Sequence, residues 1–553
     1  MWLPINWNGR FLGVGNGGMS GCIKYNDINY GASHGFATIG SNNGHDGTSG
    51  LPFLNNSGVV EDYVSRAIHT ESILGKAITE QFYEAKPHKS YYLGCSTGGR
   101  QGFKEAQDFP EDFDGIVAGA PAFDLNALMY WTGQFFLKTG DPDSPNFISA
   151  AQWDLVVEDV LKQCDSLDGF TDGVIEDPDL CNYRPEALIC GDKAGDCLTG
   201  AQAQIVRAVF EPVYVGGTLV YPRLQPGANS TQRFFAGEPH PYPIDWFRYA
   251  IYNDPGWDIA TLSSKDWEAA SKKNPYNAAT WEGDLSRARD GGVKILHFHG
   301  LEDNAISSEN SARYYNHVSQ AMGLSSNELD EFYRYFRISG MAHCRDGNGA
   351  SFIGANQETF ATFDPASNVL AAIVDWVENG KAPESILGTK YAGGSKSSGQ
   401  VLAQRRHYKT VPFMKSIYGI PKTTAVMSEY TSTRQGFQRA MQWSLAGPPD
   451  EAKLFVEALS TPGFYQILNG QLLSYDAYVK HIEEMRAKVG EYKPVLHEFL
   501  RDSDQLAARM TGTISIDGVA IEFESFMFAK VDESGRLEWL KERAVSGPVG
   551  GAS

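Results

Sequence analysis

The chain lacks the features that mark several classes of protein. Nowhere in it is there an uninterrupted apolar run of about 18 residues, the length that a membrane-spanning helix needs. It has no long run of basic residues, and its formal net charge is −20, so neither nucleic acid nor another polyanion is an expected partner. We therefore expect a globular protein that binds neither nucleic acid nor a membrane, and 553 residues are too many for one ordinary domain.

Patterns typical of signal peptides and of zinc sites are also absent. The start, Met1-Trp2-Leu3-Pro4, has no basic segment followed by an apolar one, as a secretory signal would. No Cys-x-x-Cys pair is present among the seven cysteines, and several of them stand close together among Asp and Gly, which is typical of disulfides formed outside the cytoplasm. We interpret this conflict as a missing N-terminal segment and expect a secreted protein.

The hydrophobic pattern divides the chain into three parts. Residues 1–123 and 291–426 alternate short apolar strands with helices, which predicts an α/β fold with a mostly parallel sheet. Residues 124–290 are rich in Trp, Asp, Pro and Gly and show little strand periodicity, so they are expected to form a lid inserted into that core. A Gly/Ser/Lys-rich stretch, 393–400, and a poorly patterned connector are expected to lead to a separate domain.

Residues 427–553 have the pattern of an α+β domain. Three helices are expected first, and long alternating strands follow them. Asp517-Gly518 predicts a tight hairpin turn between two of these strands. Along the second strand the large apolar residues change parity at Phe526 and Phe528, which predicts a β-bulge near Ser525.

The segment "YYLGCSTGGRQGF", residues 91–103, contains the strongest candidate for chemistry. Gly94-Cys95-Ser96-Thr97-Gly98 matches the G-x-S-x-G nucleophile elbow, and it lies between an expected short strand and an expected helix, as such an elbow requires. A pentapeptide with two glycines also recurs by chance, so Ser96 needs a base and an orienting carboxylate elsewhere in the chain.

Suitable partners follow in the chain order of the α/β-hydrolases, Ser, Asp, His. Asp303 comes just after an expected buried strand, and His343 lies on a loop after the next strand. Glu302 competes with Asp303 as the acid. His297 and His299 compete with His343 as the base, although core packing is the expected role for residues inside a strand.

Two cysteines strengthen this choice. Cys95 precedes the candidate nucleophile and Cys344 follows the candidate base. Disulfide-bonded residues have Cα atoms about 5.5–6 Å apart and sequence neighbours about 3.8 Å apart, so a Cys95–Cys344 bond would hold Ser96 and His343 within hydrogen-bonding reach. The other expected pairs are Cys164–Cys181 and Cys190–Cys197, which leaves Cys22 over.

The same residues resemble the signature of a known family. Gly94-Cys95-Ser96-Thr97-Gly98-Gly99, Asp303 and His343-Cys344 are similar to the CS-D-HC pattern of the tannase and feruloyl esterase family, and "WNGRFLGVGNGGMSG" and "GIVAGAP" are similar to it as well. The resemblance covers roughly residues 2–425. It implies an α/β-hydrolase core with an inserted lid, a Ser-His-Asp triad and a bound calcium ion. Members usually carry a signal peptide and a further cysteine before "WNGRF", which would be the expected partner of Cys22.

An acidic segment of the lid is the candidate calcium loop. "CDSLDGFTDGVIEDPDLC" alternates Asp and Gly, but no Glu stands at the closing position of an EF-hand. From the residues alone, a calcium site and a solvated acidic turn both remain open. By resemblance, a structural Ca²⁺ would be held by carboxylates and backbone carbonyls, those of Asp165, Asp168, Phe170, Asp172 and Val174.

The predicted function is hydrolysis of aromatic (phenolic) esters, such as feruloyl or galloyl esters, by a serine carboxylic ester hydrolase that forms an acyl-enzyme. The oxyanion hole is expected to use the Thr97 N–H and one N–H of the "GVGNGG" loop; we favour Gly17, and Gly15 and Gly18 remain open. The substrate is expected to be a small ester derived from plant cell walls or tannins, bound by aromatic residues of the lid. The sequence does not decide among feruloyl, galloyl and terephthalate esters.

The last part of the chain, roughly 429–543, resembles in layout a SnoaL-like domain of the NTF2-like cone fold. Such a resemblance implies a module that forms a homodimer or binds a small metabolite, and His481 and His497 are candidates to line its cavity. Two alternatives to the esterase therefore remain: a truncated, catalytically silent hydrolase, and a bifunctional protein whose C-terminal domain acts on a small metabolite.

Overall fold

The computed structural model describes residues 1–190, 197–410, 429–432, 434–502, 504–532 and 535–548. The chain divides into two compact units, Met1–Phe413 and Met414–Ser553. The domain boundary expected between residues 426 and 427 lies outside the described residues. Among the helices described, none is both long and apolar enough to cross a membrane.

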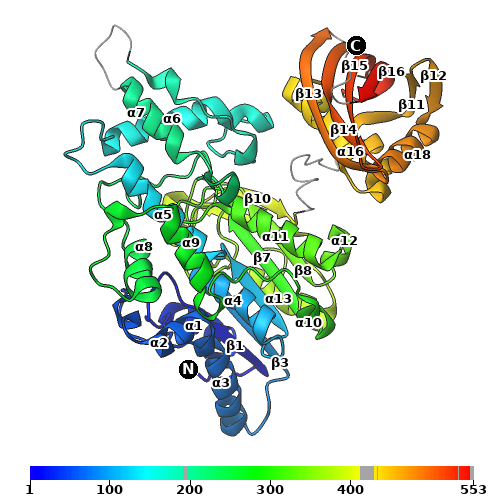
Figure 1. Ribbon diagram of the computed structural model, residues 1–553. Helices are drawn as coiled ribbons and strands as arrows, with labels where there is room; N and C mark the ends of the chain where they lie inside the picture. Colours follow the sequence, from blue (N-terminus) through cyan, green and yellow to red (C-terminus); the bar gives the residue numbers. More distant parts are fainter. Residues whose placement is uncertain (191–196, 411–428, 433, 503, 533–534, 549–553) are drawn as a thin grey trace. The chain divides into compact units, whose positions relative to one another are not determined.

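The first unit is built on a six-stranded sheet with the order β2-β1-β3-β4-β7-β8, in which every neighbouring pair is parallel (Figure 1). A fully parallel sheet needs helices on both faces to bury its apolar side chains. The strands are β1 Arg10–Val14, β2 Ala37–Ile39, β3 Lys89–Cys95, β4 Gly115–Gly119, β7 Lys294–Gly300 and β8 Tyr333–Ile338.

Helices cover both faces of this sheet, and the strand residues alternate between them. Leu12, Leu93 and Phe298 pack with α1 (Tyr25–Ser33) and α13 (Val369–Asn379). Their neighbours in sequence face the opposite way, where the covering helices are α3 (Ala67–Tyr83), α4 (Thr97–Asp108) and α11 (Ser308–Met322). The α/β core predicted from strand–helix alternation is confirmed by this arrangement. Two short helices, α2 (Ser57–Glu61) and α12 (Ser326–Leu329), complete it, and a π-helical turn at Asp62–Arg66 joins α2 to α3.

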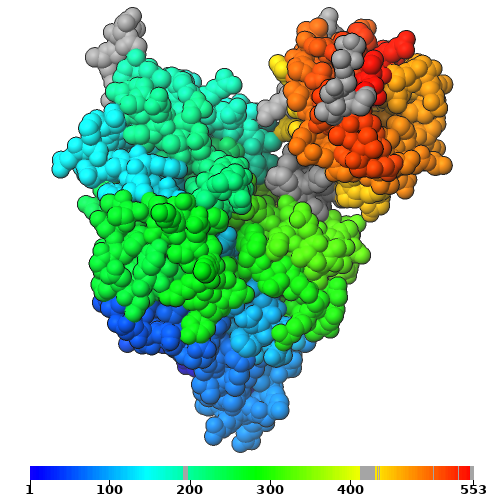
Figure 2. All heavy atoms as spheres, in the orientation of Figure 1, coloured from blue at the N-terminus to red at the C-terminus, as the bar shows by residue number. Residues whose placement is uncertain are grey.

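The predicted insertion leaves the core between β4 and β7, which are neighbours in the sheet. It consists mainly of helices around an aromatic core, in which Trp153 stacks on Phe235 with 4.2 Å between ring centroids. In the space-filling view its residues, cyan to green, form a continuous layer against the core (Figure 2). Its elements are α5 Leu125–Thr139, α6 Ala150–Cys164, α7 Gly200–Val209, β5 Val213–Val215, β6 Thr218–Tyr221, α8 Pro241–Asp245, a π-helix Trp246–Tyr252, α9 Ser264–Lys273 and α10 Ser286–Asp290.

The Gly/Ser/Lys-rich stretch at 393–400 was expected to lead toward the separate domain. In the structure it is not a linker. It forms the connection of an antiparallel hairpin between β9 (Ser385–Tyr391) and β10 (Val401–Tyr408), which belongs to the first unit. Glycine suits a flexible linker, but it also suits a turn that needs positive φ angles, and Gly393, Gly394 and Gly399 all adopt them.

The second unit has the expected order in part: α16 and α17 come first, but β11 and β12 precede the third expected helix, α18, and β11 pairs in parallel with β16, so that only β13 to β16 form an antiparallel meander. A sheet with the order β12-β11-β16-β15-β14-β13 curves around the helices, and the turn predicted at Asp517-Gly518 joins β14 to β15. The helices are α15 Glu429–Ser432, α16 Arg434–Ala446, α17 Ala452–Leu459 and α18 Tyr475–Arg486. The strands are β11 Ser460–Leu468, β12 Gln471–Ser474, β13 Val489–Asp502, β14 Gln505–Ile516, β15 Val519–Val531 and β16 Leu537–Pro548.

The β-bulge predicted near Ser525 is wrong. Strand β15 pairs with β14 without interruption along its length, and its register with β16 shifts only between Lys530 and Val531. Ser525 and Met527 point into the unit, whereas Phe526 and Phe528 are 43 % and 59 % exposed on the outer face. The change of parity therefore reflects exposed apolar residues and not an extra residue in the strand.

Candidate active site

Ser96 stands at a sharp turn between the central strand β3 and helix α4. Its φ of 68° and ψ of −124° lie outside the regions that most residues adopt, as expected for a strained nucleophile elbow. The turn requires glycines, since a Cβ on Gly94 would lie 2.6 Å from the carbonyl oxygen of Gly98. The strand thus delivers the serine hydroxyl to the carboxyl edge of the sheet, where α/β folds place their ligands.

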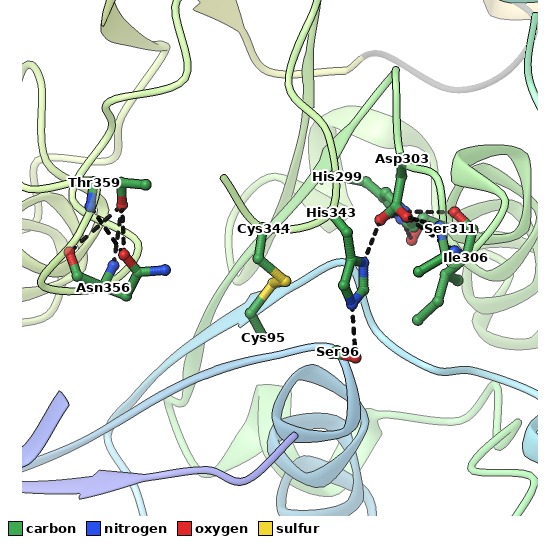
Figure 3. The surroundings of a disulfide bond; sticks show 11 residues. Cys95, Ser96, His299, Asp303, Ile306, Ser311, His343, Cys344, Asn356 and Thr359 are labelled. Carbon is green, nitrogen blue, oxygen red and sulfur yellow. Dashed lines mark hydrogen bonds and ion pairs between the residues drawn. A yellow bond between two sulfur atoms is a disulfide. The ribbon is translucent and has the colours of Figure 1, made fainter. Parts of the chain in front are cut away.

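The structure brings Ser96, His343 and Asp303 together in one hydrogen-bonded line (Figure 3). His343 Nε2 lies 2.9 Å from Ser96 Oγ, and His343 Nδ1 lies 2.8 Å from Asp303 Oδ2. Asp303 follows β7 and His343 follows β8, so the three side chains come from the ends of three strands of one sheet. A nucleophile bonded to a base, and a base bonded to a carboxylate, is the geometry of a serine hydrolase.

Asp303 is fully buried and holds its charge there. Burial alone would raise its pKa, but nearby His343 and the hydrogen bonds from His299 and His343 hold the pKa well below the usual range. Its other oxygen, Oδ1, accepts from the N–H groups of Ala305 at 2.8 Å and Ile306 at 2.9 Å. Because this pKa is depressed, the stability that it contributes is complete above about pH 4, the unfolded pKa of Asp, and is lost only in stronger acid.

The disulfide predicted between Cys95 and Cys344 is present, with 6.2 Å between the Cα atoms. It joins the residue before Ser96 to the residue after His343 (Figure 3), across a sequence separation of 249. The bond therefore ties the elbow directly to the loop that carries the base. The pairs Cys164–Cys181 and Cys190–Cys197 are bonded as predicted, and Cys22 is an exposed free thiol.

The glycine loop after β1 lies against the start of α4, where an oxyanion hole would be. Thr97 Oγ1 donates to the carbonyl oxygen of Gly18 at 2.7 Å, which fastens the loop to the helix. The Gly15 N–H already donates to Leu93 O at 3.0 Å. Among the described residues, no hydrogen bond uses the N–H of Gly17 or of Thr97, so both could bind an oxyanion.

The competing candidates do not reach Ser96. Glu302 accepts the backbone N–H of Asn348 at 2.9 Å, and burial raises its pKa to about 7. His297 and His299 are fully buried, as expected for strand residues. However, His299 contacts Asp303 directly, at 3.1 Å from Nε2 to Oδ2, and the sequence interpretation missed this contact. The available signal was the "HFH" spacing in a strand, which points both histidines to one face of the sheet.

The expected calcium loop begins at the end of α6 and is closed by the Cys164–Cys181 disulfide. Burial raises the pKa of Asp168, and the nearby carboxylates of Asp172 and Asp165 raise it further. Asp165 accepts the N–H groups of Asp172 and Gly173, and Asp172 pairs with Arg405 at 2.8 Å. The loop thus concentrates oxygen ligands, the type that Ca²⁺ binds.

One other cluster has ligand atoms close together. In the described part of the chain, the side chains of His69, Glu105 and Asp112 come within 4.8 Å of one another. His69 already bonds to Asp112 at 2.7 Å, and the Lys76 ammonium group lies beside the same residue. Because Asp112 is already bonded to His69 and lies beside Lys76, no metal site is assigned there.

In the second unit, the candidate residues His481 and His497 do not lie in a group of side chains arranged for catalysis. His497 is on the exposed face of β13, where its Nε2 lies 2.6 Å from Thr511 Oγ1. His481 lies half-buried on α18, and burial lowers its pKa. The exposed position of His497 contradicts its proposed place in a cavity.

Comparison with known proteins agrees with this geometry. The model of the family described as "Tannase and feruloyl esterase" matches residues 1–237 and 246–415. A curated relative from Aspergillus terreus, "Probable feruloyl esterase B-2", is 51 % identical over 411 residues, which are 73 % of this chain and 78 % of the relative. A relative from Emericella nidulans, "Probable feruloyl esterase B", is 49 % identical over 73 % of this chain and 78 % of its own length.

Solved structures show the same likeness. The crystal structure of feruloyl esterase B from Aspergillus oryzae has a TM-score of 0.72 and 49 % identity, covering 74 % of this chain and 82 % of that one. Tannin acyl hydrolase from Aspergillus niger has a TM-score of 0.58 and 22 % identity over 73 % of this chain and 78 % of that one, a likeness of fold.

Proposed function

The chain belongs to the tannase and feruloyl esterase family and is a carboxylic ester hydrolase, and we propose that Ser96, His343 and Asp303 are its catalytic triad. The observation that carries this proposal is the hydrogen-bonded line from Ser96 through His343 to Asp303. Such an assembled triad also argues against the alternative of a catalytically silent protein.

The proposed reaction is acyl transfer to Ser96 and then to water. His343 Nε2 accepts the proton of the Ser96 hydroxyl as its oxygen attacks the ester carbonyl, and Asp303 stabilises the imidazolium that forms. The developing oxyanion is bound by the N–H groups of Thr97 and Gly17. His343 then protonates the leaving alcohol, and a water molecule activated by the same histidine releases the acid from the acyl-enzyme.

The proposed substrates are feruloyl and related phenolic esters, as the names of the relatives suggest. Lid aromatics supply the substrate pocket, and Tyr242 of α8 is one candidate because its hydroxyl lies where a side chain on Gly18 would be. The experiment that tests this proposal is a comparison of kcat/KM for methyl ferulate, methyl gallate and an aliphatic ester of equal size. Preference for methyl ferulate supports it, and preference for the aliphatic ester would refute it.

We propose that the lid loop binds one structural Ca²⁺ through the carboxylates of Asp165, Asp168 and Asp172 and the carbonyls of Phe170 and Val174. Burial raises the pKa of Asp168, and the carboxylates of Asp172 and Asp165 raise it further; the proposal is supported by this repulsion between the acids, which a bound cation would relieve. An ion there would stiffen the lid without entering the reaction.

Chelation of calcium should therefore lower the Tm more than it lowers the activity at low temperature. A bound ion stabilises the native state by roughly RT ln(1 + [L]/Kd), about 2.7 kcal/mol at a hundredfold excess over Kd. Differential scanning calorimetry with and without a chelator measures the shift, and Asp168→Asn should abolish it. An equal Tm for treated and untreated wild-type protein would exclude a calcium site in this loop.

The protein is proposed to be secreted and to act on esters from plant cell walls or tannins. Its three disulfides support folding in an oxidising compartment.

For the second unit, we propose a SnoaL-like, NTF2-like module that forms a homodimer, supported by its helices packed against one six-stranded sheet. Five apolar side chains on the outer face of that sheet are 43–70 % exposed, on β13, β15 and β16, with β14 between β13 and β15. They are Val495, Leu500, Phe526, Phe528 and Val545. Two such faces would bury one another's apolar surface in a dimer.

The double substitution Phe526→Ser/Phe528→Ser should convert a dimer of the full chain into a monomer without loss of esterase activity. Both side chains point outward, so the packing of the unit should survive. Sedimentation velocity distinguishes the two states. The exposed pair Tyr25→Ser/Phe82→Ser of the first unit is a matched control that should leave the dimer intact. A wild-type monomer at micromolar concentration would refute the proposal.

A further inference from the structure

A chain of buried side chains leads from the interior of the core to Asp303. His297 and His299 lie on β7, Ser311 on α11 and Tyr333 on β8, and all four are inaccessible to solvent, as is Asp303. Their side chains touch end to end: Tyr333 Oη to His297 Nδ1 at 2.8 Å, His297 Nε2 to Ser311 Oγ at 2.8 Å, Ser311 Oγ to His299 Nδ1 at 2.7 Å, and His299 Nε2 to Asp303 Oδ2 at 3.1 Å.

The position of each proton in this chain follows from its surroundings. His299 Nε2 faces two oxygens that can only accept, the ionised Asp303 carboxylate and the Ile306 carbonyl at 3.2 Å, so this nitrogen carries a proton. A His299 ring that carries its single proton at Nε2 then accepts at Nδ1 from the Ser311 hydroxyl. With its hydrogen used in that way, Ser311 must accept from His297 Nε2–H.

The far end of the chain agrees with this direction. Burial holds the pKa of His297 well below its usual range, so His297 is neutral and its Nδ1 accepts from the Tyr333 hydroxyl. The His297 ring is stacked on Tyr335 at 4.4 Å between centroids, which fixes its plane. With one proton on each of the two rings, every hydrogen bond points toward Asp303, and reversing a single one would leave two donors or two acceptors facing each other.

We propose that His299 is a positioning residue of the triad, oriented by Ser311, His297 and Tyr333, which holds the Asp303 carboxylate in place and shares its Oδ2 with His343. The proposal rests on the assignment of the triad made above. With His299 present, Asp303 accepts four hydrogen bonds, two at each oxygen, which matches its roughly four lone-pair sites. The carboxylate then has no freedom to rotate away from His343.

The shared oxygen has a consequence for pH dependence. The N–H of His299 draws negative charge away from the oxygen that faces His343, so removing it strengthens the attraction between Asp303 and the His343 imidazolium. The imidazolium form of His343 should then be favoured, because an opposite charge stabilises a charged group. The other titratable groups that face this region are buried tyrosines: Tyr333 and Tyr335 beside His297, and Tyr221 from the lid. Burial raises the pKa of Tyr221, and the negative charge of Asp303 is a further cause. Their pKa values are raised above the usual range, so they do not titrate near neutral pH.

Substitution of His299 tests the proposal in the full-length enzyme. His299→Leu removes the donor and should lower kcat by about 10- to 100-fold, the range expected when a positioning group is lost, with KM unchanged. The acid limb of the kcat/KM profile should move to higher pH by roughly half a unit or more, a shift that lost packing alone would not produce. His299→Gln, whose amide can place an N–H near the position of Nε2, should restore most of kcat and return the acid limb toward the wild-type pH.

Control variants distinguish the effect of these hydrogen-bonded side chains from the effect of losing any histidine near the core. His317 lies on α11, and its Nε2 contacts the carbonyl oxygen of Trp281. His317→Leu should leave kcat and the acid limb unchanged. Ser311→Ala breaks the chain one step further from Asp303 and should have a smaller effect than His299→Leu. An unchanged kcat and acid limb in folded His299→Leu, or equal losses in the Leu and Gln variants, would overturn the proposal.

A measurement on the wild-type enzyme covers the case in which His299→Leu does not fold. In protein with ¹⁵N-labelled histidine, assigned by the loss of signals in the Gln variants, His297 and His299 should both appear as neutral Nε2–H tautomers throughout the active pH range. An Nδ1–H tautomer or a charged ring at either residue would overturn the chain. Failure of the triad itself is distinguishable, because Ser96→Ala would then retain activity whatever His299 does.

Discussion

Ser96→Ala should abolish ester hydrolysis and leave the fold intact. The substitution removes one oxygen, which contacts His343 Nε2 at 2.9 Å. Because a nucleophile and its base act together, loss of the nucleophile should lower kcat roughly a million-fold. Stability should change by only about 1 kcal/mol, the usual contribution of one hydrogen bond. Steady-state kinetics with a chromogenic aryl ester measure the first effect, and thermal unfolding measures the second.

A second serine serves as the control for this experiment. Ser33 lies on α1, where its hydroxyl donates to the Tyr30 carbonyl at 2.8 Å, and Ser33→Ala removes the same atom away from the triad. That variant should retain wild-type kcat. Turnover by Ser96→Ala within tenfold of the wild type would remove Ser96 from the mechanism.

Cys95→Ala/Cys344→Ala should lose catalysis in addition to stability. Their disulfide spans 249 residues, for which loop-closure entropy gives roughly 5 kcal/mol of stability in the simple model. The bond also fixes the spacing of Ser96 and His343, and a misplacement of about 1 Å can cost around a hundredfold in rate. We therefore expect kcat to fall by about that factor at temperatures where circular dichroism shows the variant to be folded.

Removal of a different disulfide separates the two effects. Cys190 and Cys197 are only 7 residues apart and lie in the lid, so their bond contributes roughly 2 kcal/mol in the same model. Cys190→Ala/Cys197→Ala should lower Tm slightly and keep kcat. If the variant without Cys95 and Cys344 is folded and equally active, the disulfide has a structural role only.

The sequence was sufficient to predict that Ser96, His343 and Asp303 lie together, because the signals for them are local and follow in a known chain order. An elbow motif, a carboxylate after one strand and a histidine after the next can be placed without three-dimensional information, since parallel strands bring their carboxyl ends to one edge. The cysteines beside Ser96 and His343 added an independent constraint on distance. The same holds for the inserted lid, because a long aromatic segment interrupted the alternation of strands and helices.

Features that depend on contacts between distant elements could not be predicted in this way. Phe526 and Phe528 face outward, and their positions led to the wrong prediction of a β-bulge. The periodicity of a sequence shows where apolar residues stand, but not which face of the strand is buried. Composition could not tell a hairpin turn at 393–400 from a linker. The "HFH" spacing places His297 and His299 on one face of the sheet, but the role of His299 depends on Ser311 from α11 and on Asp303 from a loop, which the spacing does not identify.

Covalent labelling with a fluorophosphonate tests the central claim most directly. Such reagents react with a serine only when a base and an oxyanion hole activate it. We expect one adduct for each chain of the wild-type enzyme, mapped by peptide mass spectrometry to Ser96, with loss of hydrolysis in proportion to labelling. An adduct on another residue, or full hydrolytic activity in protein whose Ser96 is labelled, would contradict the account.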